Sequence, residues 1–111
     1  MIASFPERRF QLWEYRVSHG SLLVRSPRGP AVSSNVDLVF AGVEYMSAPR
    51  HLRGVVVEHG SEEDRAAVHV ATGGAEAGRI YALISEGRRH LVAAAGLTID
   101  ENIRDIFDSP F

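Results

Sequence analysis

Two runs of alternating apolar and polar residues flank the dipeptide His19-Gly20, and their pattern strongly limits how the chain can fold. If His19 and Gly20 form a two-residue turn, the flanking runs pair as antiparallel strands whose side chains sort onto two faces. One face is then apolar and carries Trp13, Tyr15, Val17, Leu22 and Val24. The other face is polar, with Glu14 directly opposite Arg25 as a charge pair. The pattern predicts a β-hairpin with one buried face and one solvent-exposed face.

The segment VSHGS at 17–21 recurs as VEHGS at 57–61. The pairing that suits the first copy fails for the second, because the apolar run GVVV would face the acidic run SEED. Residues 59–64 are therefore predicted to form a longer loop after a buried strand. With no third copy and only scattered matches beyond the five residues, we reject an internal repeat.

The middle of the chain is also rich in β-forming residues. Residues 35–49 predict one long strand bent near Gly42, and the alternative is a second tight hairpin that turns at Ala41-Gly42. The segment 52–59 is the next predicted strand. We favour the bent strand over the second hairpin.

The segment 64–74 has two interpretations. A strand is favoured because the segment contains the β-branched residues Val68 and Val70. The alternative is a short helix over 61–71, opened by Ser61 with Asp64 three residues on.

Glycine marks two further connections. The segment TGGAEAG at 72–78 has no phosphate-loop spacing and predicts a simple connection. Residues 79–99 predict a hairpin that turns near Glu86-Gly87.

The C-terminal segment departs from the β pattern. Its large apolar residues fall at helical spacing, namely Ile99, Ile103, Ile106 and Phe107. Thr98 and Glu101 have the spacing of a capping box, so a short C-terminal helix that ends before Pro110 is favoured. The alternative is an extended tail that continues the last strand.

These elements predict a mainly β fold over residues 1–111 as a single domain, since 111 residues is a typical size for one core. We expect about seven antiparallel strands in a small barrel, a sandwich or a bent sheet, with the short C-terminal helix as an option. The order of elements resembles that of pleckstrin-homology-like domains in architecture. Such a resemblance concerns topology, and function does not follow from it.

Composition narrows the classes of function. The chain has no Cys, no apolar run long enough to span a membrane and a formal net charge of −2. We therefore expect a cytoplasmic protein, with neither a membrane nor nucleic acid as partner, because nucleic-acid binders usually carry a strongly basic face. All 12 basic residues are Arg, which fits the codon usage of a GC-rich, bacterial genome.

Residues with catalytic or metal-binding chemistry are present without a diagnostic arrangement. The five histidines, at 19, 51, 59, 69 and 90, lack metal-ligand spacing. No Gly-x-Ser-x-Gly elbow is present. We expect no enzyme activity, no metal and no cofactor.

Arginine is concentrated in three stretches, at 25–29, 49–54 and 87–90. Arginine in loops suits carboxylates, phosphates or an acidic protein surface. The candidate binding residues are Arg50, His51, Arg53, Arg88 and Arg89.

The favoured hypothesis is a non-catalytic protein-interaction domain whose partner is another protein or a second copy of the chain, in an inhibitor, immunity-type or homo-oligomeric role. An exposed sheet edge would allow strand addition. The first alternative is a β-barrel that binds a small ligand in a cavity lined by Trp13, Tyr15 and Tyr81. A metal-dependent enzyme and a nucleic-acid binder rank lower.

Overall fold

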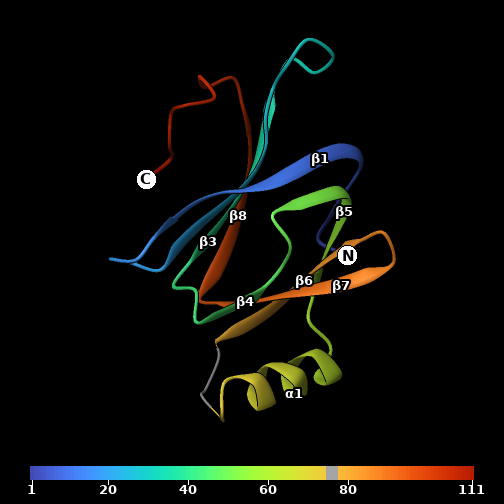
Figure 1. Cartoon of the computed structure of the whole chain (residues 1–111), viewed down its shortest axis with the longest axis vertical. Helices are drawn as coiled ribbons and strands as arrows, with labels where there is room; N and C mark the ends of the chain where they lie inside the picture. The colour runs from blue at the N-terminus through green and yellow to red at the C-terminus, as the bar shows by residue number, and fades with distance from the viewer. Residues whose placement is uncertain (75–77) are drawn as a thin grey trace.

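The computed structural model describes residues 1–74 and 78–111, and within them the chain forms one antiparallel sheet of eight strands and one helix (Figure 1). The elements are β1 (Ala3–Arg16), β2 (Ser21–Ser26), β3 (Asn35–Ala41), β4 (Tyr45–Ser47), β5 (His51–His59), α1 (Glu62–Ala71), β6 (Arg79–Ser85), β7 (Arg88–Ala94) and β8 (Gly96–Asn102). Across the sheet the order is β4-β7-β6-β5-β1-β2-β3-β8. The prediction of a mainly β single domain is confirmed. Within the predicted connection 72–78, residues 75–77 lie outside the described residues.

The two edge strands of the sheet are β4 and β8. β3 and β4 follow each other through a bend at Gly42, and they pair in turn with β8 and β7. Across the bend, Ala95 N donates to Ala41 O at 2.8 Å, and Glu44 N donates to Ala93 O at 2.8 Å. The chain therefore bends near Gly42 as predicted and forms no tight hairpin at Ala41-Gly42, but the bend divides the predicted single strand into β3 and β4.

The bent sheet encloses the main core. Its buried apolar residues are Phe10, Leu22, Val24, Val36, Leu38, Phe40, Leu52, Val55, Val57, Tyr81, Leu83, Val92 and Ala94. Two aromatic rings from opposite parts of the sheet meet there, because the centroids of Phe40 and Tyr81 lie 5.7 Å apart in an edge-on arrangement. Burial of this apolar set supplies the main drive for folding.

The favoured strand at 64–74 is wrong, because this segment contains most of helix α1. Ser61 and Asp64 form a reciprocal capping box: Asp64 N donates to Ser61 Oγ at 3.1 Å, and Ser61 N donates to Asp64 Oδ2 at 2.8 Å. These hydrogen bonds satisfy N–H groups at the helix N-terminus. They favour the helix more strongly than the β-branched residues favour a strand. Val68 is buried against Ile80 and Ala93, whereas Val70 is exposed, as expected for a helix that lies on the sheet.

The first hairpin forms, but with a different turn, and β2 is buried on both faces, including the predicted Leu22 and Val24. The turn has four residues, 17–20, and Arg16 pairs with Ser21. A bulge at Trp13 changes the register further along. Tyr15 and Val17 are exposed, contrary to the prediction.

On β2 the face predicted to be solvent-exposed is in fact buried, since Leu23 and Arg25 are both 0% exposed, whereas Arg16 on β1 is exposed as predicted. Arg25 does not pair with Glu14. Its guanidinium binds Asp37 of β3 through Nε–Oδ1 at 2.7 Å and Nη2–Oδ2 at 3.0 Å. A charged residue is buried here because a carboxylate on the next strand compensates it.

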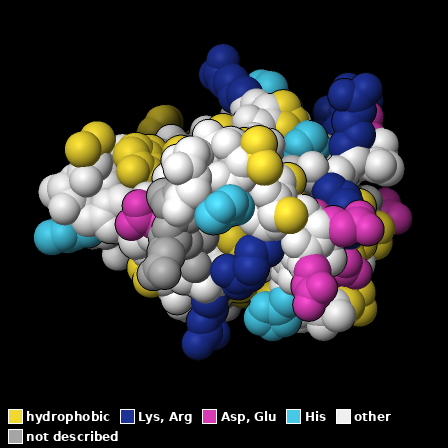
Figure 2. All heavy atoms as spheres, turned by 90° about the horizontal axis from the view of Figure 1, so that it is seen from below, with side chains coloured by type: hydrophobic (Ala, Val, Ile, Leu, Met, Phe, Trp, Pro, Cys, Tyr) yellow, Lys and Arg dark blue, Asp and Glu magenta, His cyan; other side chains and the backbone are white. Residues whose placement is uncertain are grey.

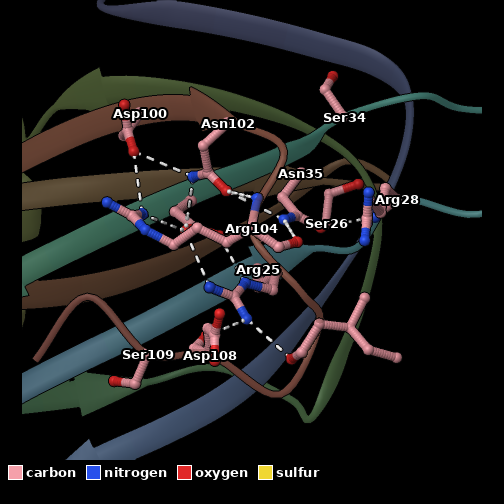
Figure 3. A network of polar contacts seen from close by, with 12 residues as sticks. Arg25, Ser26, Arg28, Ser34, Asn35, Asp100, Asn102, Arg104, Asp108 and Ser109 are labelled. Carbon is pink, nitrogen blue, oxygen red and sulfur yellow. Dashed lines mark hydrogen bonds and ion pairs between the residues drawn. The ribbon is translucent and has the colours of Figure 1, made fainter.

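The predicted C-terminal helix is also wrong. Ile99 lies in β8 and pairs with Leu38, and residues 103–111 form an irregular tail. Arg25 Nη1 donates to the carbonyl oxygens of Ile106 and Asp108, both at 2.9 Å, which holds the tail across β2 (Figure 3). Two interactions oppose a helix here. Residues up to Asn102 pair with β3 as strand β8, and the buried guanidinium of Arg25 binds the carbonyl oxygens of the tail.

Candidate functional site

Basic side chains from three strands converge at one end of the sheet and form what we call the basic groove. Its residues are Arg9 of β1, His51 and Arg53 of β5, and Arg88 and His90 of β7. A pocket of about 340 Å³ lies between the last four of these residues, and Pro49, Leu52, Ser85 and Glu86 complete its lining. A second pocket extends the groove over Arg9 and Gln11.

The groove opens because β5 leaves β6 halfway along its length. β6 pairs with β5 only at Val56 and beyond, so no strand pairs with the first half of β5 on this side. Gly54 takes φ +63° at this point, and a Cβ added there would lie 2.8 Å from Pro6 O. Only glycine fits this bulge without strain, because the conformation is left-handed and the backbone of β1 is close.

Ser85 holds the two sides of the groove together. Its Oγ accepts from Arg53 N at 3.1 Å and donates to Arg53 O at 2.9 Å. The main-chain groups of Arg53 therefore point toward β6 and away from β1. By the alternation of a strand, the main-chain groups of His51 face the same side.

Two arginines lie directly opposite each other on neighbouring strands, since Arg9 of β1 pairs with Arg53 of β5. Because the main-chain groups of Arg53 point away from β1, this is a non-hydrogen-bonded pair, the type that brings side chains closest. Like charges in such a pair are destabilising. Both side chains are exposed, and neither forms an ion pair with a carboxylate among residues 1–74 and 78–111.

The opposite wall is the hairpin between β6 and β7. Glu86 and Gly87 form its turn with φ +52° and +75°, which confirms the predicted turn. From this turn, strand alternation directs Arg88 and His90 to the groove and Arg89 to the other side.

The candidate residues predicted from the sequence divide between these two sides. His51, Arg53 and Arg88 line the groove. Arg50 is exposed just before β5, where its carbonyl oxygen accepts from Leu12 N at 2.9 Å. Arg89 binds residues around α1 and is not part of the groove.

Sequence reasoning missed Arg9 and His90 as site residues. Arg9 belongs to no arginine-rich loop, and only the β1–β5 register places it beside Arg53. His90 stands in the stretch 87–90, so alternation from the predicted Glu86-Gly87 turn could have placed it with Arg88.

The far side of β7 carries an acidic region next to α1, and Figure 2 shows acidic side chains gathered toward one end of this face. Arg89 binds Asp64 at 2.7 Å and Glu58 at 3.5 Å. The Arg89 hydrogen bond is the main cause that lowers the pKa of Asp64 to about 2. With both carboxylate oxygens hydrogen-bonded, Asp64 caps the helix and is a poor proton acceptor.

A third polar cluster lies beneath the C-terminal tail (Figure 3). Asp37 receives hydrogen bonds from Arg25 and from Asn102 Nδ2, the latter at 3.0 Å. Arg25, Asp37 and Asn35 are each 0% exposed. These three residues are closed to solvent and have their hydrogen bonds satisfied within the chain, so their role is structural.

Residues proposed for a ligand cavity lie in different environments. Tyr81 is in the main core and is 3% exposed, whereas Trp13 stacks on the Arg25 guanidinium with 5.5 Å between Cζ and the ring centroid. Across residues 1–74 and 78–111, His, Asp and Glu do not gather in any group of three that could hold a metal ion. In the same part of the chain, no helix is long and apolar enough to cross a bilayer.

Compared with known proteins, the chain matches no family model, no curated protein and no solved structure to a significant degree. The basic groove therefore has to be interpreted from its own geometry and charge.

Proposed function

We propose that this chain is a non-catalytic protein-interaction domain that binds an acidic segment of a partner protein in the basic groove. The observation that carries the proposal is the cross-strand pair of Arg9 and Arg53. Two like charges held opposite each other cost stability, and carboxylates of a partner would remove that cost on binding.

The shape and lining of the groove favour a peptide segment. The groove runs along the first half of β5, which does not pair with β6, and two apolar residues, Pro49 and Leu52, lie beside the charged ones. Such a mixed lining can accept both the carboxylates and the aliphatic parts of acidic side chains. The formal net charge of −2 argues against a nucleic acid as the partner, since phosphate backbones are bound by strongly basic faces.

A binding role is also favoured over a catalytic one by the state of the groove's hydroxyl group. Ser85 is buried, and its Oγ both donates to and accepts from the main chain of Arg53. A hydroxyl engaged in this way is a structural bridge, because a nucleophile needs an adjacent base to accept its proton.

The proposal is tested with a short fluorescein-labelled peptide rich in Glu and a matched peptide rich in Gln, measured by fluorescence anisotropy against the whole chain. The Glu peptide should bind, and its affinity should fall as salt is added. Arg53→Gln should weaken binding about tenfold, which corresponds to the loss of one charge-assisted contact.

Arg28→Gln is the matched control, because Arg28 is exposed and lies outside the groove. It should leave binding unchanged. Equal binding of the two peptides, or equal effects of Arg28→Gln and Arg53→Gln, would contradict the proposal. Full competition by inorganic phosphate at low concentration would instead identify the site as one for a small anion.

A further inference from the structure

Residues 105–108 of the C-terminal tail form a hydrogen-bonded turn, which we call the acidic turn. Asp108 N donates to Asp105 O at 2.9 Å, and Phe107 N donates to Asp105 Oδ1, also at 2.9 Å. Arg25 binds two main-chain carbonyl oxygens of the same segment. These bonds hold the main chain in place, while the side chains of Asp105, Phe107 and Asp108 remain exposed to solvent.

The exposed side chains of the acidic turn are suited to binding. Phe107 is 86% exposed, the largest exposed fraction among the large apolar residues in the described ranges 1–74 and 78–111. Within the same ranges, neither Asp105 nor Asp108 forms an ion pair. An aromatic ring on a fixed main chain is a favourable anchor, because it leaves water when it enters a pocket of a partner.

We propose that the acidic turn of one copy of this chain binds in the basic groove of a second copy. The Phe107 ring enters the pocket between β5 and the β6–β7 hairpin, and the two carboxylates of the turn face the arginines of the groove. This inference rests on the function proposed above and identifies the partner as the chain itself.

The groove and the acidic turn are complementary in charge and in chemical type. The groove carries three arginines against the single carboxylate of Glu86, whereas the turn carries two carboxylates and no basic residue. Carboxylates form charge-assisted hydrogen bonds with guanidinium groups, and aromatic rings pack favourably against them. The chain already contains a contact of the second kind, between Arg25 and Trp13.

The size of the pocket and the rigidity of the turn also favour this contact. The pocket volume of about 340 Å³ lies at the lower end for small-ligand sites, which suits one aromatic side chain. Because Arg25 and the internal hydrogen bonds already hold the turn, binding costs little conformational entropy.

The groove and the acidic turn lie on opposite sides of one molecule. In Figure 1 the tail, drawn in red, lies at the left, and the turn between β6 and β7, drawn in orange, lies at the right. A chain whose tail is held by Arg25 therefore cannot fill its own groove. The contact joins different surfaces of two copies, so each dimer keeps one free groove and one free turn, to which further copies can add.

The first test uses the unmodified chain and a peptide with blocked ends that has the sequence of residues 105–110, DIFDSP. This peptide should displace the labelled Glu peptide, because both compete for the same arginines. The same peptide with Phe107→Ala should be needed at about tenfold higher concentration, since it lacks the aromatic anchor.

The second test is self-association of the whole chain, measured by sedimentation equilibrium. One turn in one groove is a small interface, so the dissociation constant should be on the order of 100 μM and should rise with added salt. Phe107→Ala and Arg53→Gln should each weaken association about tenfold. Val17→Ala is the matched control and should change nothing, because Val17 is 83% exposed in the β1–β2 turn, outside both surfaces.

Mixing the two variants tests the head-to-tail arrangement. Arg53→Gln keeps its acidic turn, and Phe107→Ala keeps its groove. At concentrations where each variant alone is monomeric, the mixture should form dimers that contain one copy of each and no larger assemblies. Association through any other surface would show no such gain on mixing.

The outcomes separate this inference from the proposed function. A chain that binds the Glu peptide, but neither binds DIFDSP nor self-associates, would overturn the inference and leave the function standing. Self-association that survives both Arg53→Gln and Phe107→Ala would also overturn the inference. If neither peptide binds, the inference and the proposed function both fail.

Discussion

Arginine occurs in two opposite environments in this molecule, one buried and paired, the other exposed and without an ion pair among the described residues. Arg25 is 0% exposed, binds Asp37 through two hydrogen bonds and donates two more to the C-terminal tail. Arg9 and Arg53 are exposed, face each other across two strands and have no ion pair among the described residues. The chain compensates the first charge completely and leaves the second pair uncompensated.

The difference teaches how to separate structural charges from binding charges. A buried charge that lost its partner would cost several kcal/mol, so folding requires Arg25 to be paired. An exposed pair of like charges costs only a few tenths of a kcal/mol, so a fold can tolerate it. Uncompensated charge on a rigid sheet is therefore available to a ligand, whereas compensated charge is not.

The largest effect is expected where compensation is complete. Arg25→Ala leaves Asp37 buried without its main partner and frees the carbonyl oxygens of Ile106 and Asp108, so it should lower the free energy of unfolding by about 3 to 5 kcal/mol. Urea denaturation measures this. Hydrogen exchange should show the tail losing protection first. A loss below about 1 kcal/mol would mean that the ion pair is not structural.

Asp64 and Arg89 form an intermediate case, since the Asp64 side chain is 9% exposed and that of Arg89 is 41% exposed. The pKa of Asp64 is lowered to about 2, so this carboxylate stabilises the folded state above its unfolded pKa, and the contribution disappears as pH falls from about 4 to about 2. Screening at the exposed guanidinium limits the contribution to about 1 kcal/mol.

Acid denaturation measures this term by comparing the chain with Asp64→Asn. The variant should be less stable by about 1 kcal/mol at neutral pH and should differ less and less from the original chain toward pH 2. A difference that stays constant with pH would show that the capping hydrogen bonds, and not the charge, make the contribution.

The exposed pair should behave in the opposite way to Arg25. Arg53→Gln removes one of two facing like charges, so the free energy of unfolding should stay the same or rise by up to about 0.5 kcal/mol while binding of the acidic peptide falls. Thermal melting and anisotropy on the same samples measure both. A loss of stability above about 1 kcal/mol would place Arg53 among the structural charges.

Much of the fold follows from the sequence because strand signals are local. The β-forming residues at 35–49 predicted the bend near Gly42, and the Glu86-Gly87 turn predicted the hairpin of β6 and β7. The helix at Glu62–Ala71 was misassigned because its capping box and its contact with Ile80 outweigh the β-branched residues in it. The terminal helix was misassigned because pairing with β3 and the buried Arg25 decide the path of the tail.

The site was only partly predictable for a similar reason. The arginine-rich stretches identified Arg53 and Arg88 as site residues. The number of arginines in a stretch could not distinguish Arg88 from Arg89, whose side chains lie on opposite faces of β7. Arg9 required the register between β1 and β5, which includes a shift between Phe5 and Arg9 opposite Gly54. A register between strands so far apart in the sequence cannot be predicted from a local sequence pattern.

The smallest effect concerns the one acidic residue of the groove. Glu86 has φ +52° in a tight turn, a conformation that Asn before Gly adopts more easily, so Glu86→Asn should raise the free energy of unfolding by a few tenths of a kcal/mol. It also removes the only carboxylate that lines the described pocket, and the acidic peptide should bind about twofold tighter. Glu86→Gln removes the same charge without the turn preference, so it should reproduce the tighter binding and leave the melting temperature unchanged. If Glu86→Gln bound the peptide no better than the original chain, the net charge of the groove would not affect its affinity. The uncompensated arginines would then have no demonstrated role in binding.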